Sequence, residues 1–472
     1  MEGAMLVAGV DSSTQSTKVV LCRAEDGTVV GQASAPHPPG TECDPEDWWR
    51  ALTKAGRDLL DRADAIGVAA QQHGMIVLDE DGQVIRPALL WNDLRSAPQA
   101  VELIGELGGP GEWARRTGSV PSASFTVTKL RWLAEHEPEA AARTAHVLLP
   151  HDWLTWRLAG APPGGQATDH GDASGTGYFG PASGGWLPDL ATAALGHSPA
   201  LPRLAAPAEV VGHHKGTGAP LSAGTGDNMG AALGLGLLPG EVVVSIGTSG
   251  TAYAVTAKPA ADETGAVAGF ADATGRFLPL VATVNAARVL SVTAGLLGID
   301  VASFDQLALT APPGAEGLTL LPYLDGERTP NRPEAAGVLR GLTSANMSPA
   351  NLARAAVEAV LCSLADAIDH VTALGVSAER VLLIGGAAQS PAVRAIAPAV
   401  FGVPVVVPEP GEYVALGAAR QAAWVLTQPD AAEPPPWPRA VTETYSAEPG
   451  TALRRRYARL RDDTAGWRET MD

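Results

Sequence analysis

Two short turns rich in serine, threonine and glycine are the features of this 472-residue sequence that first suggest chemistry. One lies in VAGVDSSTQSTKVVLC near the start and the other in EVVVSIGTSGTAYAV near the middle, each between two apolar strands. Successive N–H groups and hydroxyls in such a turn can bind an anion, especially phosphate. Neither turn is a Walker A loop, because GxxxxGK[ST] is absent from both, and either turn alone could be an ordinary hairpin. Two turns at matching positions predict that they hold the phosphates of one nucleotide from opposite sides.

Asp11 ends the first of these strands, and the second turn has no counterpart for it. A carboxylate beside phosphates is repulsive unless a Mg²⁺ ion lies between them, directly or through water. We therefore expect Asp11 to belong to a Mg²⁺ site. The second turn needs no aspartate of its own, because one metal ion suffices.

Asp227 opens an Ala-rich helical pattern in AGTGDNMGAALGLG. As an N-cap it would accept hydrogen bonds from the backbone of the helix, a role that Asp favours strongly. As a general base it would take the proton from a substrate hydroxyl that attacks phosphorus. The two roles can coexist, because a helix N-terminus suits an anionic site.

Polar clusters follow two further apolar runs, in AAQQHG and in LLWND. They comprise Gln71, Gln72 and His73 after the first run, and Asn92 and Asp93 beside Trp91 after the second. Ligands of open α/β sheets gather beyond the carboxyl ends of strands. Amide, imidazole and carboxylate groups next to an indole suit a polyhydroxylated ligand, although a lone histidine is more often structural.

Two later segments carry weaker signals. In LLIGGAAQSP a pair of glycines could let a planar group approach the backbone, or could simply form a tight strand–helix turn that Ser390 caps. In LPYLDGERTP, Arg328 could contact phosphate, but we expect it to brace Asp325 and Glu327.

The elements that must position these residues occur in the same order in both halves. In each half, apolar strands surround a turn and a helix follows; the first helix, around residues 45–60, should have Asp44 as N-cap and Pro45 at N1. Alternating strands and helices continue to about residue 426, which predicts an α/β fold from an ancient duplication. Glycine and proline near residues 234–241 indicate the boundary. We expect domains at 1–236 and 237–426, then a Pro-rich connector and a C-terminal helix at 427–472.

Composition excludes several classes of function. The net charge of −18 lacks the basic footprint of a nucleic-acid binder. No apolar run of about 18 residues suggests a membrane span, and the N-terminus does not resemble a signal peptide. Three scattered cysteines fit a reducing cytoplasm. We expect a soluble cytoplasmic protein with small-molecule partners, and a homodimer is among the expected assemblies.

Taken together, these stretches resemble the FGGY family of carbohydrate kinases, from about residue 5 to residue 425. GVDSSTQSTK is similar to the family's first phosphate loop, with Ser12 where a glycine is usual, and AAQQHG resembles a GQMHG segment, with Ala70 and Gln72 as departures. LLWNDLR, TGDNMGAALG, SIGTSG, YLDGERTP, IGGAAQS and ALGAAR complete the set, with Ala387 in place of a common third glycine.

The resemblance implies an actin-like, ribonuclease H-like fold of two α/β domains flanking a cleft, and phosphorylation of a ketopentose, most plausibly D-xylulose at C5, by Mg²⁺ and ATP. It implies Asp227 as catalytic base and Asp11 as the metal-site aspartate, with Asp227 also near the metal ion, through water or directly. The implied sugar contacts are Gln72, His73, Trp91, Asn92, Asp93, Asp227 and Asn228. The implied ATP contacts are Thr14, Lys18, Gly247, Thr248, Ser249, Gly385, Gly386 and Ser390. Two alternatives stay open: a kinase for ribulose, glycerol or fuculose, and an actin- or Hsp70-like ATPase switch without a sugar pocket.

Overall fold

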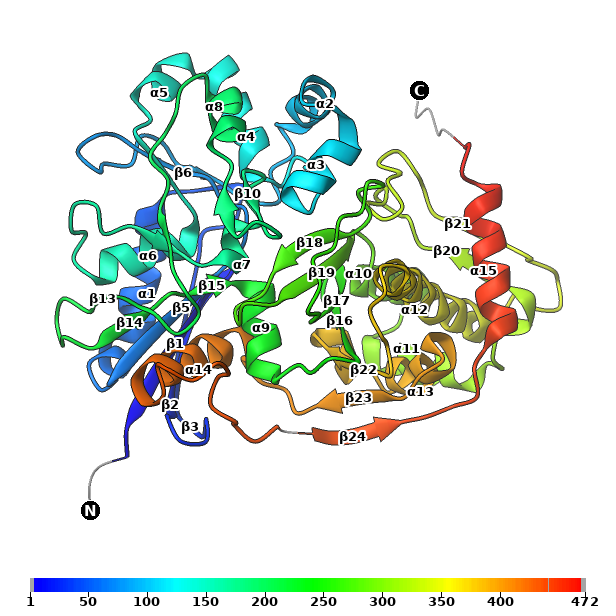
Figure 1. Ribbon diagram of the computed structural model, residues 1–472. Helices are drawn as coiled ribbons and strands as arrows, with labels where there is room; N and C mark the ends of the chain where they lie inside the picture. Colours follow the sequence, from blue (N-terminus) through cyan, green and yellow to red (C-terminus); the bar gives the residue numbers. More distant parts are fainter. Residues whose placement is uncertain (1–3, 440, 468–472) are drawn as a thin grey trace. The chain divides into compact units, whose positions relative to one another are not determined.

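The computed structural model describes residues 4–439 and 441–467, which form two compact units. The first unit runs to Leu237 and also includes Val255–Pro279 and Gly411–Arg439. The second comprises Leu238–Ala254, Leu280–Pro410 and the described residues from 441 onward. Figure 1 labels the elements of both units.

The sheet of the first unit has the strand order β13-β14-β5-β1-β2-β3, with the short β15 also pairing with β5. Its strands are β1 (Leu6–Ser12), β2 (Ser16–Arg23), β3 (Val29–Pro36), β5 (Ala65–Ala70), β13 (Val210–His213), β14 (Pro220–Ser222) and β15 (Thr225–Gly226). The strands β1 and β5 are almost wholly buried because helices cover both faces of the sheet.

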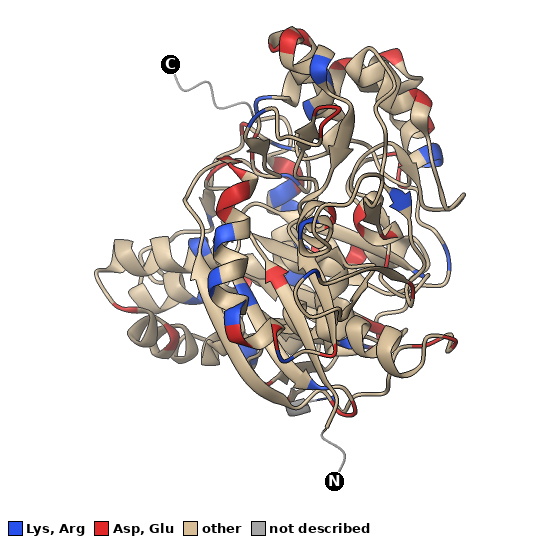
Figure 2. Ribbon diagram, turned by 90° about the vertical axis from the view of Figure 1, so that its left-hand side faces the viewer, with Lys and Arg blue, Asp and Glu red and all other residues tan. Residues whose placement is uncertain are grey.

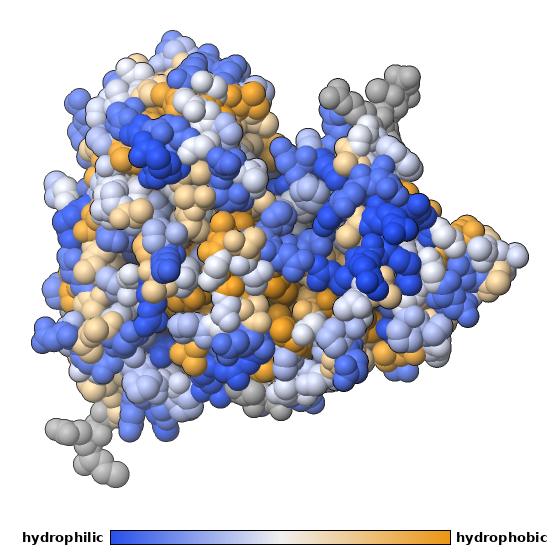
Figure 3. Space-filling view, turned by 45° about the vertical axis from the view of Figure 1, so that its right-hand side comes forward, coloured by the Kyte–Doolittle hydropathy of each residue, from blue (hydrophilic) through white to orange (hydrophobic). Residues whose placement is uncertain are grey.

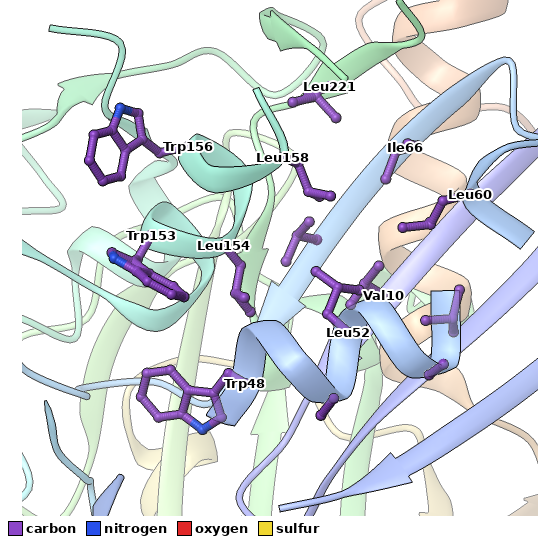
Figure 4. Packing of buried hydrophobic residues seen from close by; sticks show 14 of the residues in the cluster. Val10, Trp48, Leu52, Leu60, Ile66, Trp153, Leu154, Trp156, Leu158 and Leu221 are labelled. Carbon is purple, nitrogen blue, oxygen red and sulfur yellow. The ribbon is translucent and has the colours of Figure 1, made fainter. Parts of the chain in front are cut away.

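Helix α1 (Pro45–Leu60) covers one face and begins as the sequence predicts. The Asp44 side chain accepts a hydrogen bond from the N–H of Glu46, and Pro45 occupies the first turn. Trp48 and Leu52 of α1 pack with Val10 of β1 and with α6 (Pro150–Leu158), as Figure 4 shows. The charged positions of α1 lie on its other side. Figure 2 shows Lys and Arg interspersed with Asp and Glu in the molecule.

Helix α14 (Tyr413–Thr427) covers the opposite face of the sheet, although it comes late in the chain. The contact is close because glycines lie at the crossings. A Cβ on Gly9 of β1 would lie 1.9 Å from the carbonyl oxygen of Ala415. Likewise, a Cβ on Gly417 would lie 1.9 Å from the carbonyl oxygen of Gly230, on α9 (Asp227–Leu235). Backbone-to-backbone packing of this kind leaves no room for a side chain.

The remaining elements of the first unit are short and surround this sheet. The helices are α2 (Ala97–Glu106), α3 (Gly109–Thr117), α4 (Thr126–His136), α5 (Pro138–Arg143), α7 (His170–Ala173) and α8 (Pro188–Leu195). The strands are β4 (Glu42–Cys43), β6 (Ile76–Leu78), β7 (Ala88–Leu89), β8 (His146–Leu148), β9 (Ala167–Thr168), β10 (Phe179–Gly180), β11 (Gly185–Trp186), β12 (Arg203–Leu204) and β18 (Ala268–Ala271).

The second unit contains a sheet in the order β19-β17-β16-β22-β23-β24. Its strands are β16 (Glu241–Ile246), β17 (Gly250–Ala254), β19 (Phe277–Thr283), β22 (Arg380–Ile384), β23 (Val405–Pro408) and β24 (Val441–Tyr445), and β20 (Thr319–Leu321) pairs separately with β21 (Val338–Arg340). The helices are α10 (Ala287–Leu297), α11 (Val301–Thr310), α12 (Pro349–Ala373), α13 (Pro391–Phe401), α15 (Thr451–Asp463) and the 3₁₀ turns Ala315–Gly317 and Gly386–Gln389.

The two sheets repeat one pairing pattern, which supports the duplication inferred from the sequence. In the first, β3-β2-β1 is an antiparallel meander and β1-β5-β14 is parallel. In the second, β19-β17-β16 is antiparallel and β16-β22-β23 is parallel. The two Ser/Thr/Gly turns connect corresponding strands, β1 to β2 and β16 to β17, so each unit contributes one turn at the same place in its sheet.

The C-terminal helix α15 docks through its arginines. Arg454 pairs with Asp366 and Asp369, and Arg461 also pairs with Asp366. Figure 3 shows strongly hydrophilic residues over this helix. Among the described residues, no single helix is long and apolar enough to cross a membrane; only α10 and α11 taken together, bent by 90° at their junction, reach that length and composition.

Candidate active site

Three parallel strands of the first unit end together and bring predicted site residues to one edge of the sheet. Ala70 of β5 pairs with the end of β1 and also with the end of β15. Asp11 lies at the end of β1, Gln71–His73 follow β5, and Asp227 follows β15. The structure therefore gathers these residues where ligands of α/β sheets bind.

Asp11 is a buried carboxylate at this edge. Burial raises the pKa of its carboxyl group to about 6, although a hydrogen bond from Ser13 Oγ (2.5 Å) and the charge of Lys18 oppose the rise. Lys18 itself pairs with Glu412, with 2.6 Å between Nζ and Oε2. Among the described residues, no cation therefore pairs directly with Asp11. A carboxylate that is to bind a metal ion from solution needs to be unpaired in this way.

Asp227 is the first residue of α9, and its N-cap is Gly226. The interpretation of Asp227 as the N-cap is therefore wrong by one residue. Its Oδ1 accepts hydrogen bonds from the backbone N–H and the Nδ2 of Asn228, at 2.8 and 2.9 Å. Burial raises the pKa of Asp227 to about 7, and the negative charges of Asp11 and Asp172 add to the rise. A carboxylate with a pKa near neutrality is well matched to taking a proton from a hydroxyl group.

Gln72 and His73 are held firmly beside Asp227. The Gln72 Oε1 atom accepts a hydrogen bond of 3.1 Å from Asn228 Nδ2. His73 has a φ of 68°, in the left-handed region that is unfavourable for residues other than glycine. Its Nδ1 lies 2.6 Å from the carbonyl oxygen of Gly175, and its ring packs against Phe125 with 4.8 Å between centroids. Strained conformations of this kind gather at ligand sites.

Several buried polar atoms around this edge lack a hydrogen-bond partner within the described part of the chain. They are both amide atoms of Gln71, Nε2 of Gln72, Oδ1 of Asn92 and Oδ1 of Asp172. Buried polar groups are normally satisfied, and each exception calls for an explanation such as a ligand. A sugar with several hydroxyl groups supplies both the donors and the acceptors that these atoms need.

The second polar cluster is only partly available to a ligand. Trp91 donates a 2.8 Å hydrogen bond from Nε1 to Thr14 Oγ1, so the indole lies beside the first turn. Both oxygens of Asp93 are engaged, by Arg95 at 2.8 and 2.9 Å and by Thr41 at 2.8 Å. Burial opposes ionisation of Asp93, but these hydrogen bonds prevail and lower its pKa. Asp93 therefore orders the loop around Asn92 in the absence of ligand.

The second unit contains a cavity of about 680 Å³ beside the second turn. Of the predicted ATP contacts, Gly247, Thr248, Gly386 and Ser390 line it. Gly385 shapes it, since its φ is 91° and a Cβ there would lie 2.7 Å from the carbonyl oxygen of Ile246. The lining is mainly apolar, as a nucleobase and ribose require.

The cavity also contains residues that sequence reasoning did not identify. Asp305 accepts a 2.6 Å hydrogen bond from Ser390 Oγ, and Ser390 caps α13 as predicted. Arg288 lines the cavity and pairs with Asp325 at 3.0 Å. No motif marked either residue, because both lie in ordinary helical sequence.

The expected role of Arg328 as a brace agrees with the structure for one of the two carboxylates. The charge of Glu327 acts on Arg328, which is close to it. Glu327 also accepts hydrogen bonds from the backbone N–H groups of Val284 (2.6 Å) and Arg328 (2.8 Å), whereas Asp325 pairs with Arg288.

A buried group of four residues behind the first site was also missed by sequence reasoning. It consists of His151, Asp152, Asp169 and Asp172. The available signal was the density of charge in LPHDW and in ATDHGDASG, two otherwise apolar or small-residue segments.

These observations define a nucleotide-dependent enzyme of the α/β class, and the chain belongs to the FGGY family of carbohydrate kinases. Residues 6–234 match the N-terminal domain of that family, and residues 242–426 match its C-terminal domain. The predicted family, the actin-like two-domain α/β fold and the assignment as a carbohydrate kinase are confirmed. The family implies ATP as a substrate, and the alternative of an ATPase switch without a sugar substrate is set aside.

Proteins similar to this chain include several named xylulose kinase. A xylulose kinase of Streptomyces coelicolor is 50% identical over 447 residues, which are 90% of this chain and 89% of the relative. A xylulose kinase of Streptomyces rubiginosus is 46% identical over 467 residues, 95% and 92% of the two chains. The crystal structure of xylulose kinase from Bifidobacterium adolescentis matches with a TM-score of 0.91 and 44% identity, over 97% of this chain and 99% of that one.

Proposed function

We propose that this carbohydrate kinase transfers the γ-phosphoryl group of ATP to the C5 hydroxyl of D-xylulose. The observation that carries the proposal is the position of Asp227, a partly buried carboxylate with a pKa of about 7 beside polar atoms that lack partners in the described part of the chain. The relatives named xylulose kinase support the choice of sugar, since they match over nearly the whole chain.

Asp227 is the general base of the proposed reaction. Asn228 holds its Oδ1, so Oδ2 is the atom that would accept the hydroxyl proton. The sugar oxygen then forms a bond to the γ-phosphorus, the bond to the leaving oxygen of ADP breaks, and the proton leaves Asp227 for solvent. Gln72, His73 and Asn92 would orient the sugar through hydrogen bonds.

The nucleotide would lie with its adenosine in the cavity of the second unit. Gly386 is open toward that cavity and leaves room for a planar base, whereas Thr248 and its neighbours would contact phosphate through the second turn. Thr14 and Lys18 are assigned to phosphate at the first turn, although Trp91 and Glu412 hold them in this structure.

The carboxylates of Asp11, which is buried, and Asp227, which is partly buried, fit a Mg²⁺ ion, because both are hard oxygen donors with raised pKa values and a divalent cation would favour their ionised forms. When bound, Mg²⁺ would neutralise charge on the phosphates of ATP. We place the reaction in the cytoplasm, where Cys22, Cys43 and Cys362, all free in this structure, stay reduced.

The test is a coupled assay of ADP release across D-xylulose, D-ribulose, L-fuculose, glycerol and no acceptor. The proposal expects the highest kcat/KM with D-xylulose and little release without acceptor. If kcat/KM is about tenfold higher with another acceptor, that acceptor replaces D-xylulose as the substrate. ADP release that does not depend on added sugar would contradict the assignment of the sugar site.

A further inference from the structure

His151 lies at the centre of the buried group behind the sugar site, and both of its ring nitrogens face carboxylates. Its Nδ1 lies 2.6 Å from Asp172 Oδ2. Its Nε2 lies 3.3 Å from Asp152 Oδ1 and 4.0 Å from Asp169 Oδ1. None of these four side chains is more than 4% exposed.

The positions of the carboxylates favour one protonation state of this ring. The Nδ1 contact to Asp172 is a hydrogen bond, whereas Nε2 lies within ion-pair distance of Asp152 and has no hydrogen-bond partner in the described part of the chain. A neutral imidazole has one donor nitrogen and one acceptor nitrogen, so with Nδ1–H on Asp172 its Nε2 lone pair would point at carboxylates that only accept. An imidazolium instead turns a positive N–H edge toward carboxylates on both sides. The charge is needed as well, because three buried carboxylates without a cation would be very unfavourable.

The surrounding charges favour the same state. Burial by itself lowers the pKa of His151, but Asp152, Asp172 and Asp169 overcome it and raise the pKa to about 10. Tyr178 and Asp227 are also titratable and close to these carboxylates: burial keeps the Tyr178 phenol neutral by raising its pKa, and the charge of Asp172 helps to raise the pKa of Asp227.

The three carboxylates differ in what else they contact. Asp169 caps α7, accepting from the N–H groups of Gly171 and Asp172 at 2.9 Å each, and accepts a hydrogen bond from Thr225 Oγ1 at 2.8 Å. Asp152 accepts from the N–H of Leu149 at 2.8 Å. Both of these groups hold the local backbone.

Asp172 and Asp152 each have one oxygen without a hydrogen-bond partner among the described residues, but the free oxygen of Asp172 is the one that lies toward Gln72. This oxygen of Asp172, Oδ1, is buried. This atom lies 3.2 Å from the point where a Cβ on Gly226 would be, and Gln72 Cγ lies 2.7 Å from the same point. Asp172 and Gln72 thus meet over the glycine that precedes Asp227, and Gln72 Nε2 also lacks a partner in the described chain.

We propose that His151 is a permanent imidazolium cation that fixes Asp172 as a positioning residue behind the sugar site, and that Asp172 acts through the amide of Gln72. An acceptor oxygen and a donor amide placed against the same glycine are complementary. The Oδ2 contact to His151 prevents Asp172 from turning away, so its Oδ1 is available to the Gln72 side chain that faces the substrate. The effect on sugar binding rests on the proposed sugar site, whereas the charge of the ring does not.

A bound metal ion is the rival explanation for the cluster. The ligand atoms of His151, Asp152 and Asp172 lie within 4.8 Å of one another, as in a metal site. However, the 2.6 Å contact between Nδ1 and Oδ2 is a direct hydrogen bond and leaves no space for an ion between these atoms. The structure therefore favours a proton as the cation.

The first experiment measures the ring itself in the wild-type protein without sugar. Histidine-selective ¹⁵N NMR, assigned with His151→Gln, should show both nitrogens of His151 protonated from pH 6 to pH 9. A transition to a neutral ring near pH 6.5 would overturn the proposal, and so would one equivalent of metal in the purified protein by elemental analysis. This result does not depend on which sugar the enzyme uses.

The second experiment compares variants that separate charge from shape. His151→Gln and Asp172→Asn should each raise the KM for D-xylulose about tenfold, the equivalent of one hydrogen bond that a misplaced Gln72 would no longer make to the sugar, with the KM for ATP within twofold of wild type. His151→Lys keeps the positive charge and should recover most of the loss, whereas the exposed His213→Gln serves as a neutral control. An unchanged KM for D-xylulose in Asp172→Asn would refute the positioning role even if a His151 variant fails to fold. Failure of wild type to use D-xylulose would instead refute the proposed function and leave the NMR result intact.

Discussion

Asp11 and Asp227 leave the ends of two strands, β1 and β15, that pair with the same strand β5, and the negative charge of Asp11 helps to raise the pKa of Asp227. Two carboxylates at one sheet edge, one buried and one partly buried, repel each other, so both favour binding a cation or a proton. A kinase uses both events, since it binds a metal–nucleotide complex and takes a proton from its acceptor. The predictions below follow from this pair and from the elements that hold it.

Asp11→Asn should lower turnover at saturating Mg²⁺ by about 10²-fold or more, because the carboxylate that attracts the ion is lost while its shape is kept. ADP release as a function of Mg²⁺ concentration measures this effect. Ser13→Ala, which removes only the hydrogen bond to Asp11, should retain most activity. Full activity of Asp11→Asn would rule out the metal role.

Asp227→Asn should stabilise the ligand-free protein at pH 8 but not at pH 4. Burial raises the folded-state pKa of Asp227 to about 7 from an ordinary value of 3.8. Between these values the unfolded chain has released its proton and the folded chain has not, so stability falls as pH rises, and above pH 7 the full cost remains. Each pKa unit of this difference corresponds to about 1.4 kcal/mol, so the free energy of unfolding of the variant at pH 8 should exceed that of wild type by up to about 4 kcal/mol.

Thermal unfolding from pH 4 to pH 8, without metal or nucleotide, measures the difference in stability between Asp227→Asn and wild type. The expected difference in Tm between variant and wild type grows with pH. A constant difference over the whole range would show that ionisation of Asp227 is not the cause.

Gly9→Ala should destabilise the first unit by about 1–3 kcal/mol or more, because the new Cβ would lie 1.9 Å from the carbonyl oxygen of Ala415 on α14. Gly105→Ala is the matched control: it lies in helix α2, a Cβ there meets nothing within 4 Å, and alanine favours helix. Urea unfolding of the two variants should move in opposite directions. Equal midpoints would contradict the close packing of β1 against α14.

Gly386→Leu should raise the KM for ATP about tenfold or more and leave the KM for the sugar unchanged. A Cβ at Gly386 meets no atom within 4 Å, so the fold tolerates the side chain, which then occupies the cavity that Gly386 lines. Gly105→Leu on the first unit should alter neither constant. A normal KM for ATP in Gly386→Leu would place the nucleotide elsewhere.

Much of the fold could be predicted from local sequence. Asp44 and Pro45 begin α1, Ser390 caps α13, and the two apolar hairpins around the Ser/Thr/Gly turns appear as expected. These features depend on residues that are neighbours in the chain, and their chemistry is visible in the sequence. The cap at Asp227 was misplaced by one residue because helix boundaries depend on backbone angles that the side chain alone does not set.

Long-range packing could not be predicted. Nothing in the sequence of α14 indicates that it covers β1 in the first unit, since that depends on Gly9, which is more than 400 residues away from it in the chain. His151 and Asp172 are 21 residues apart, and only the fold brings them within 2.6 Å. The contacts of Arg95 and Thr41 with the oxygens of Asp93 could not be predicted either, because Thr41 is distant from Asp93 in the sequence.

The most direct test of the account is the turnover of Asp227→Ala with D-xylulose and ATP, together with the binding of both substrates by calorimetry. The account predicts that kcat falls by about 10²–10⁴-fold while ATP binds nearly as tightly as to wild type. An undiminished kcat would contradict the role of Asp227 as the base, and with it the mechanism proposed for this site.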